Sequence, residues 1–327
     1  MSAVTQADQA APGAIPAGGL IGRRGLADRS FQWLALAAGM LVLVILVLIA
    51  VSTTQQAASW FSTEGWGIFG TVWDPAANKF GAMPFIYGTA ITGIIALVMA
   101  VPVSIAIALL LTEVVPYRAA RPIVYVVDLL AVVPSVVWGL WCILVFAPWI
   151  QHVYASIASA VNGIPVLDSL FGAPTSGASF FTAGIILAFM ITPIVTSLSR
   201  EVIATVPAVD REGAYALGST RWEMIRGVVW PHSQGGVVGA VLLGLGRAMG
   251  ETIAAALVIG SSPSITSHLF ATGYNMPAVI ANQFGESTGV FKAGLMGLGV
   301  LLFAFTIIIN VLARGAVERS ARRMRGA

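Results

Sequence analysis

Two ionisable residues fall within an otherwise apolar stretch of the sequence. Arg247 and Glu251 lie in residues 235–261, where nearly all other side chains are small or apolar. A charged side chain at the centre of a bilayer costs at least about 2.5–3.5 kcal/mol, so it needs a partner or a watery path. Because residues four apart share one face of a helix, an ion pair between these two is sterically available.

Two interpretations of the pair stay open. Arg247 and Glu251 either tie membrane helices together or line a substrate pathway. In a pathway, the guanidinium of Arg247 would donate hydrogen bonds to a crossing oxyanion, and Glu251 would hold the arginine when the path is empty. An ionised Glu251 would repel that anion, so the pathway requires an arginine that reaches away from it or a protonated carboxyl.

Small residues and prolines predict how the neighbouring helices are packed. Four glycines of the same stretch form two small-xxx-small spacings, which favour close approach of another helix. They are Gly235, Gly239, Gly246 and Gly250. Asp128 is a further acid in an apolar stretch, and we interpret it as structural. Pro134 and Pro193 are each expected to kink a helix, because proline removes a backbone hydrogen bond.

The elements that must position these residues are membrane helices. The chain has 57% hydrophobic and 9% charged residues and a mean hydropathy of +0.89, whereas soluble domains carry about a quarter charged residues. A bilayer core about 30 Å thick needs roughly 20 apolar residues per helix. About six stretches qualify: residues 31–54, 85–111, 122–147, 179–199, 235–261 and 290–313. The sequence therefore predicts an all-α, multi-pass membrane protein.

Basic residues alternate between the connections and predict the orientation. Arginines precede the first stretch, follow the sixth, and occur between the second and third and between the fourth and fifth, whereas the other connections hold only Lys79 and Lys292. Both termini are therefore expected on the cytoplasmic side of an inner membrane. Because the basic residues follow membrane topology, lipid is an expected partner and nucleic acid is not.

The chain divides into four predicted segments. Residues 1–30 form a disordered cytoplasmic tail, 31–84 a first membrane helix with an outer aromatic segment, 85–315 the main membrane domain, and 316–327 a basic cytoplasmic tail. The aromatic side chains of residues 55–84 are interpreted as a belt at the membrane surface.

Two motifs that would indicate an enzyme, a Walker loop and a zinc-protease motif, are lacking. A Walker loop needs G-x-x-x-x-G-K-[ST], and neither lysine of the chain has that context. No H-E-x-x-H zinc motif occurs, and the lone Cys142 allows neither an intrachain disulfide nor a cysteine metal cluster. The sequence predicts a non-enzyme without a metal or cofactor of its own.

A charged cytoplasmic loop, residues 200–233, interrupts the apolar pattern. It is expected to form two short helices, Pro207 to Leu217 and Arg221 to Val229. The turn Gly218-Ser219-Thr220 joins them and supplies an N-cap to the second.

The same loop resembles the EAA loop of ABC importer permeases, whose pattern is E-A-A, three residues, G, nine residues, I-x-L-P. Glu212-Gly213-Ala214, Gly218 and Pro231 match that spacing, although Gly213 replaces an alanine. Val228 and Trp230 replace the isoleucine and leucine of the pattern, and remain apolar. The resemblance implies that this loop forms a coupling helix that docks in a groove of an ATPase subunit.

Further segments resemble the permease pair of the phosphate-specific ABC importer, more its PstC type than its PstA type. The resemblance covers roughly residues 65–315, and the run GLGRAMGET from Gly244 to Thr252 is its most specific part. Other matching segments are Trp73-Asp74-Pro75, Pro84 to Thr89, Asp128 to Gly139 and Val279 to Glu286. Asp128 and Trp138 stand where the family more often has Glu and Tyr.

The resemblance implies a type I ABC importer permease fold and ATP-driven import of inorganic phosphate. The implied partners are a second permease of PstA type, two PstB-type ATPase subunits that bind ATP and Mg, and an extracytoplasmic phosphate-binding protein of PstS type. Two alternatives stay open. The cargo could be another oxyanion, such as sulfate, molybdate or phosphonate, or the chain could be an ATP-independent secondary transporter, which predicts an inverted repeat and more intramembrane acids.

Overall fold

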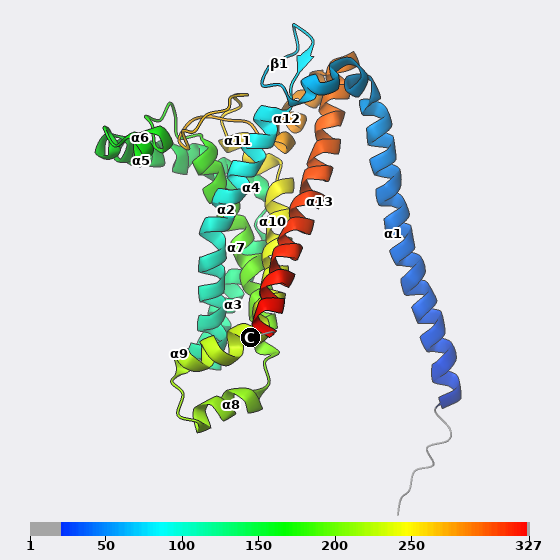
Figure 1. The fold of residues 1–327 in the computed structure, drawn as a ribbon, viewed down its shortest axis with the longest axis vertical. Coiled ribbons are helices and arrows are strands. Elements are labelled where there is room, and N and C mark those ends of the chain that lie inside the picture. Colours follow the sequence, from blue (N-terminus) through cyan, green and yellow to red (C-terminus); the bar gives the residue numbers. More distant parts are fainter. Residues whose placement is uncertain (1–20, 326–327) are drawn as a thin grey trace, which may run out of the picture. The chain divides into compact units, whose positions relative to one another are not determined.

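The computed structural model describes residues 21–325, and it consists of helices with one hairpin of two short strands (Figure 1). The chain falls into two units, up to Ser52 and from Thr53 onwards, which are described separately. Six stretches in the described part are long and apolar enough to cross a membrane. They are Asp28–Phe69, Met83–Val114, Ser135–Val161, Phe180–Ala204, Arg221–Gly250 and Gly289–Gly315. The predicted six-helix membrane fold is therefore confirmed.

Helix α1 (Ile21–Glu64) provides all of the first unit that the structure describes. Its apolar side chains from Phe31 to Ile49 are exposed, as suits a helix that meets lipid. The predicted disordered tail lies outside the described residues up to residue 20, and residues 21–30 are helical. A long helix, once nucleated, adds further turns at little cost, which accounts for its early start.

The second unit is built around four long helices. They are α2 (Met83–Leu109), α7 (Phe180–Ala204), α10 (Trp230–Gly250) and α13 (Gly289–Arg325). Membrane helices gain little hydrophobic free energy from packing, so they approach closely through small residues. A Cβ atom added at Gly184 of α7 would collide with Ile95 of α2, and one at Gly244 of α10 would lie 2.6 Å from the Val195 side chain of α7.

Two predicted membrane helices are broken where a continuous helix is expected. Helix α3 (Tyr117–Val132) ends before the extended residue Val133, and α4 (Ser135–Trp141) begins directly after Pro134. The predicted kink at Pro134 is thus a complete break, because the residue before a proline avoids the α conformation. Helix α10 ends at Gly250, and α11 (Ile253–Val258) follows two residues later. Helix α7 runs through Pro193 without ending.

One end of the bundle, called here the α8 end, carries two short helices (Figure 1). They are α8 (Ala208–Ala216) and α9 (Arg221–Met224). The π-helical segment η4 (Ile225–Val229) joins α9 to α10, and a second one, η2 (Leu110–Val114), ends α2. An apolar cluster holds these elements together, and it consists of Ala108, Ile203, Val206, Met224, Ile225, Val229 and Val237.

The opposite end, called the α5 end, carries the remaining elements. They are η1 (Gly65–Phe69), β1 (Trp73–Asp74), β2 (Lys79–Phe80), η3 (Cys142–Phe146), α5 (Ala147–Val161), α6 (Pro165–Leu170), α12 (Met276–Gln283) and η5 (Phe284–Glu286). Strands β1 and β2 pair antiparallel, with Trp73 opposite Phe80. In Figure 1, α5 and α6 extend sideways from the bundle, so the apolar stretch Ser135–Val161 is not one straight helix. The predicted span 122–147 covers most of α3, all of α4 and η3, and the first residue of α5.

The aromatic segment between α1 and α2 is packed into the protein. Trp60 and Phe80 are fully buried, and the indole Nε1 of Trp60 donates a hydrogen bond of 3.0 Å to the carbonyl of Phe80. Trp73 packs edge-on against Phe80 and Phe85. The predicted surface belt is therefore wrong for these residues, because the hairpin folds them onto the end of the bundle; Trp66 remains exposed.

Candidate functional site

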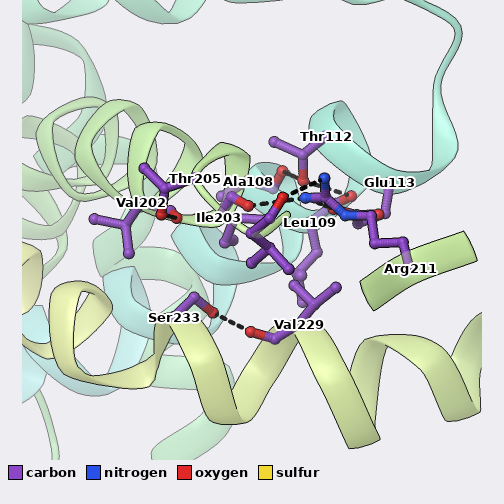
Figure 2. Close-up of polar contacts among 11 residues, drawn as sticks. Ala108, Leu109, Thr112, Glu113, Val202, Ile203, Thr205, Arg211, Val229 and Ser233 are labelled. Atoms are coloured by element: carbon purple, nitrogen blue, oxygen red, sulfur yellow. Dashed lines mark hydrogen bonds and ion pairs between the residues drawn. The ribbon is translucent and has the colours of Figure 1, made fainter. Parts of the chain in front are cut away.

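A buried ion pair fastens α8 to the bundle (Figure 2). The Nη2 atom of Arg211 lies 3.0 Å from Oε1 of Glu113, at the end of α2. The same guanidinium donates hydrogen bonds of 2.9 Å to the carbonyls of Ile203 and Val206, at the end of α7. The side chain of Glu113 is 6% exposed and that of Arg211 is 22% exposed. One side chain of α8 thus contacts the ends of both central helices, and the whole contact is called the Arg211 latch below.

The turn after α8 requires a glycine. Gly218 has a φ of +84°, a left-handed conformation that costs other residues roughly 1–2 kcal/mol. Its backbone N–H donates to the carbonyl of Tyr215, and that of Ser219 donates to Ala214, so the last carbonyls of α8 are satisfied. Gly218 therefore ends α8 and turns the chain toward α9.

Helix α9 begins with a capping box. The hydroxyl of Thr220 accepts the N–H of Glu223, and the Glu223 carboxylate accepts the N–H and the hydroxyl of Thr220. The expected helix, turn and capped helix of the loop are therefore confirmed. Rigid ends on both helices make the loop a defined element, which can transmit a displacement.

The remaining predicted coupling residues lie on the outside of this element. Glu212 and Gly213 are exposed on α8, and a Cβ atom added at Gly213 would contact nothing within 4 Å. Ala214 is half-buried against the apolar cluster of the α8 end. Pro231 is exposed in the first turn of α10, directly after the π-helical segment η4.

Large apolar side chains are also exposed on these two helices. Leu217 is 89% exposed, Val209 76% and Trp222 67%. Contiguous apolar patches on a surface mark contact sites for other proteins or for a membrane. These three side chains lie on the same element as the Arg211 latch, so a partner bound there would act on α2 and α7.

The predicted ion pair between Arg247 and Glu251 is not formed. Helix α10 ends at Gly250, and Glu251 has extended backbone, with a ψ of 121°. Its carboxylate instead accepts the N–H of Ala254, in the first turn of α11. Residues four apart share one face only on a continuous helix. Because α10 ends at Gly250, between the two residues, Arg247 and Glu251 do not share a face.

Arg247 points away from the rest of the chain. Its neighbours Ala248 and Met249 are buried, whereas Arg247 is exposed in the last turn of α10 and has no hydrogen bond or ion pair to a described residue. A cation is favoured at the C-terminus of a helix by the helix dipole. Exposure to lipid would still be costly, so this face of α10 must meet water or protein.

Glycines accompany Arg247 on this face. A Cβ atom added at any of the four predicted packing glycines would contact nothing within 4 Å of this chain, and they are Gly235, Gly239, Gly246 and Gly250. No helix of the described chain packs against them, so the prediction that they allow close approach of another helix stays a prediction. Gly236 and Gly244 have that role, against α7. The exposed side of α10 thus carries the four predicted glycines together with Leu243, which is 63% exposed, and Arg247.

Asp128 is exposed on α3 and lies in a narrow cleft beside Arg200 of α7, but it forms no ion pair with a described residue. The structural role predicted for it stays a prediction.

The sequence also contains the pattern G-x-S-x-G, from Gly285 to Gly289. In a nucleophile elbow this pattern follows a strand, and the serine hydroxyl is open to substrate. Here the pattern lies between η5 and α13, and Ser287 is buried, with its hydroxyl donating to the carbonyl of Phe284. The pattern ends a short helix and carries no catalytic geometry.

Comparison with known proteins relates this arrangement to a family. Residues 80–326 match the family described as "Binding-protein-dependent transport system inner membrane component". The chain belongs to this family. The helices, the break after Arg247 and the α8–α9 element thus occur in a permease subunit of an ABC transporter, in a bacterial inner membrane.

Curated relatives sharpen the comparison. A protein of Mesorhizobium japonicum named "Phosphate transport system permease protein PstC" is 43% identical over 300 residues, which cover 91% of this chain and 92% of the relative. A protein of the same name from Haemophilus influenzae is 41% identical and covers 84% of this chain and 88% of the relative. The predicted resemblance to PstC-type permeases is confirmed.

Solved structures show the same fold at low identity. One is titled a bacterial alginate ABC transporter in complex with its pentasaccharide-bound periplasmic protein, and it matches with a TM-score of 0.59 and 14% identity, covering 90% of this chain and 97% of that chain. Another alginate ABC transporter structure matches with a TM-score of 0.54, 16% identity and coverage of 90% and 99%. The predicted ABC importer permease fold is therefore confirmed.

Sequence reasoning missed the Arg211 latch. Arg211 counted only as a topology marker, and Glu113 was not considered at all. The available signal was the position of Glu113, a lone carboxylate directly after an apolar stretch, which must reach water or a buried cation.

Proposed function

We propose that this chain is a transmembrane subunit of an ATP-driven importer that carries inorganic phosphate across the bacterial inner membrane. The observation that carries the proposal is Arg247, a cation without a partner among the described residues, exposed in the last turn of a membrane helix. The name shared by its relatives supports phosphate as the cargo.

The chemistry of Arg247 suits a passing oxyanion. A guanidinium presents paired N–H donors that match two oxygens of a phosphate and stays charged at any physiological pH. The carboxylate of Glu251 is held by the N–H of Ala254 and lies more than 4.0 Å from any basic nitrogen of the described residues. The arginine is then free to bind an anion, which satisfies one of the two conditions that the pathway requires.

The open face of α10 supports a second permease as a partner. A bilayer would not cover Arg247 favourably, whereas a facing helix could approach α10 closely at the glycines, where nothing of this chain lies within 4 Å. The substrate path would then run between the two permeases, with Arg247 exposed to it.

The exposed apolar face of α8 and α9 supports an ATPase as the partner at the α8 end. Leu217, Val209 and Trp222 would be buried in a groove of that subunit, which binds ATP and Mg. The arginines of residues 200–226 favour the cytoplasmic side of the membrane for this end of the bundle. The extracytoplasmic binding protein would dock at the α5 end.

The Arg211 latch explains how ATP binding would open the path. Closure of two ATPase subunits displaces α8, and the latch carries the displacement to the ends of α2 and α7. Because α10 is packed on α7 through Gly244, the movement reaches the face that bears Arg247. The helices would then rock between outward-open and inward-open states.

Competition experiments test the cargo. The complete importer, reconstituted in vesicles with its ATPase, second permease and binding protein, is expected to take up labelled phosphate with ATP, and tenfold excess sulfate or molybdate is expected to leave uptake unchanged. Inhibition by sulfate or molybdate would move the assignment to another oxyanion, because an arginine fits each of these anions.

A further inference from the structure

A second basic site lies at the α8 end, on helices that do not contain Arg247. A cavity of about 300 Å³ opens between η2, α3 and α7, and it is lined by Arg121 and Tyr125 of α3, Tyr117 at the start of α3, and Arg200 of α7. This volume is about ten times the share of one water molecule in the liquid, roughly 30 Å³, and therefore accommodates a small hydrated anion.

Both arginines have N–H donors available to the cavity. Nη2 of Arg121 donates a hydrogen bond of 3.0 Å to the hydroxyl of Tyr117, and its guanidinium lies 4.7 Å above the centre of the Tyr117 ring. Arg200 is half-buried near the end of α7 and has no hydrogen bond or ion pair to any residue that the structure describes. Arg121 is therefore preorganised, while Arg200 has all its donors available.

No carboxylate among the described side chains forms an ion pair with Arg121 or Arg200. Neither Asp nor Glu is among the residues that line the cavity. Asp128 lines an adjoining cleft with Arg200 but lies beyond 4.0 Å from its basic nitrogens. Two cations that face one cavity repel each other, so an anion between them would be bound favourably.

We propose that this cavity binds a phosphate group, carried either by an anionic phospholipid of the cytoplasmic leaflet or by free inorganic phosphate. Guanidinium groups donate paired hydrogen bonds to phosphate oxygens. Basic pockets between membrane helices on the cytoplasmic side suit lipid headgroups, and tyrosines such as Tyr125, 66% exposed here, favour the level of the headgroups.

Native mass spectrometry of the assembled importer tests the proposal. The complex, without its binding protein, is released from nanodiscs of phosphatidylcholine with one fifth phosphatidylglycerol, and retained lipid is counted. The double variant Arg121→Gln, Arg200→Gln is expected to lose one phosphatidylglycerol per complex, with apparent affinity lowered about 30-fold, equivalent to roughly 2 kcal/mol. Arg118→Gln is the matched control, because Arg118 is an exposed arginine of the same helix turn outside the cavity.

A second arm separates the two sources of phosphate. The lipid-free complex in neutral detergent is titrated with labelled inorganic phosphate, and a bound phosphate that the double variant loses but an Arg247→Ala variant keeps would assign the cavity to free phosphate. The variant Arg121→Lys, Arg200→Lys keeps both charges and is expected to retain the ligand, which distinguishes lost binding from a misfolded complex. Equal phosphatidylglycerol and phosphate binding in the wild type and the glutamine double variant would overturn the proposal, whatever the cargo of the importer.

Discussion

Removing one partner of the Arg211 latch should uncouple ATP hydrolysis from transport. Glu113→Gln leaves the guanidinium of Arg211 beside a neutral amide, and Arg211→Gln leaves the carboxylate of Glu113, 6% exposed, without its cation. Breaking a buried ion pair in this way costs about 3–5 kcal/mol. Since Arg211 is 22% exposed and keeps two carbonyl acceptors, the lower figure applies to Glu113→Gln.

Weakening the latch should detach α8 from the bundle more often. A loss of about 3 kcal/mol raises the fraction of molecules with α8 detached from the bundle about 100-fold. The ATPase would then still bind the exposed face of α8, but its closure would no longer displace α2 and α7. We expect phosphate taken up per ATP hydrolysed to fall sharply, while ATPase docking is retained.

The assay measures uptake and hydrolysis in the same proteoliposomes. The double variant Glu113→Gln, Arg211→Gln removes both charges together, so it should be less impaired than the sum of the single variants, and Arg118→Gln is the matched control. Wild-type uptake per ATP in both single variants would refute the coupling role of the latch. Additive effects in the double variant would show that the two residues act independently.

Three further predictions concern the helices that carry these sites. Gly218→Ala should destabilise the turn after α8 by roughly 1–2 kcal/mol, because its φ is +84°, and a pull-down of the ATPase should weaken accordingly; unchanged binding would contradict this. Thr220→Ala should cost about 1 kcal/mol by removing the cap of α9, and faster hydrogen exchange confined to α9 would verify it. Gly244→Ala should lower the thermal stability of the subunit, since its Cβ would lie 2.6 Å from the Val195 side chain, whereas Gly246→Ala, with nothing within 4 Å, should spare the subunit and weaken assembly with the second permease. Equal stability of the two glycine variants would count against the packing described for α10.

The sequence was sufficient for much of the fold because membrane spans depend on composition over long windows. Apolar stretches of about 20 residues identify crossings without knowledge of their packing, and the helix-turn-helix at Gly218 carries explicit local signals in its glycine and its capping residues.

The helix breaks were harder to predict. The glycines are the strongest signal for a helix end in the run from Gly244 to Thr252. That signal is ambiguous, because glycine is also frequent within membrane helices. The end at Gly250 is accompanied by a carboxylate contact from Glu251 to α11, which depends on where the chain turns. The assumption of a continuous helix therefore gave a false ion pair at Arg247.

Long-range contacts were beyond the sequence pattern. Glu113 and Arg211 are 98 positions apart, so only the folded bundle shows that they meet. The packing partners of the α10 glycines were also unpredictable. Glycine spacing indicates that another helix can approach closely, but it does not show which helix does so. Gly236 and Gly244 pack against α7, and nothing in the described chain lies within 4 Å of a Cβ at the predicted four.

ATP-dependent uptake of labelled phosphate by the complete importer, compared between the wild type and Arg247→Ala, tests the central claim most directly. Loss of a charge-assisted contact of about 1.5–3 kcal/mol predicts a fall of roughly 10- to 150-fold in uptake, with assembly and ATPase docking intact and Arg118→Gln unaffected. Wild-type uptake by an assembled Arg247→Ala complex would remove Arg247 from the path, and uptake that persists without the ATPase or nucleotide would contradict the account of an ATP-driven importer.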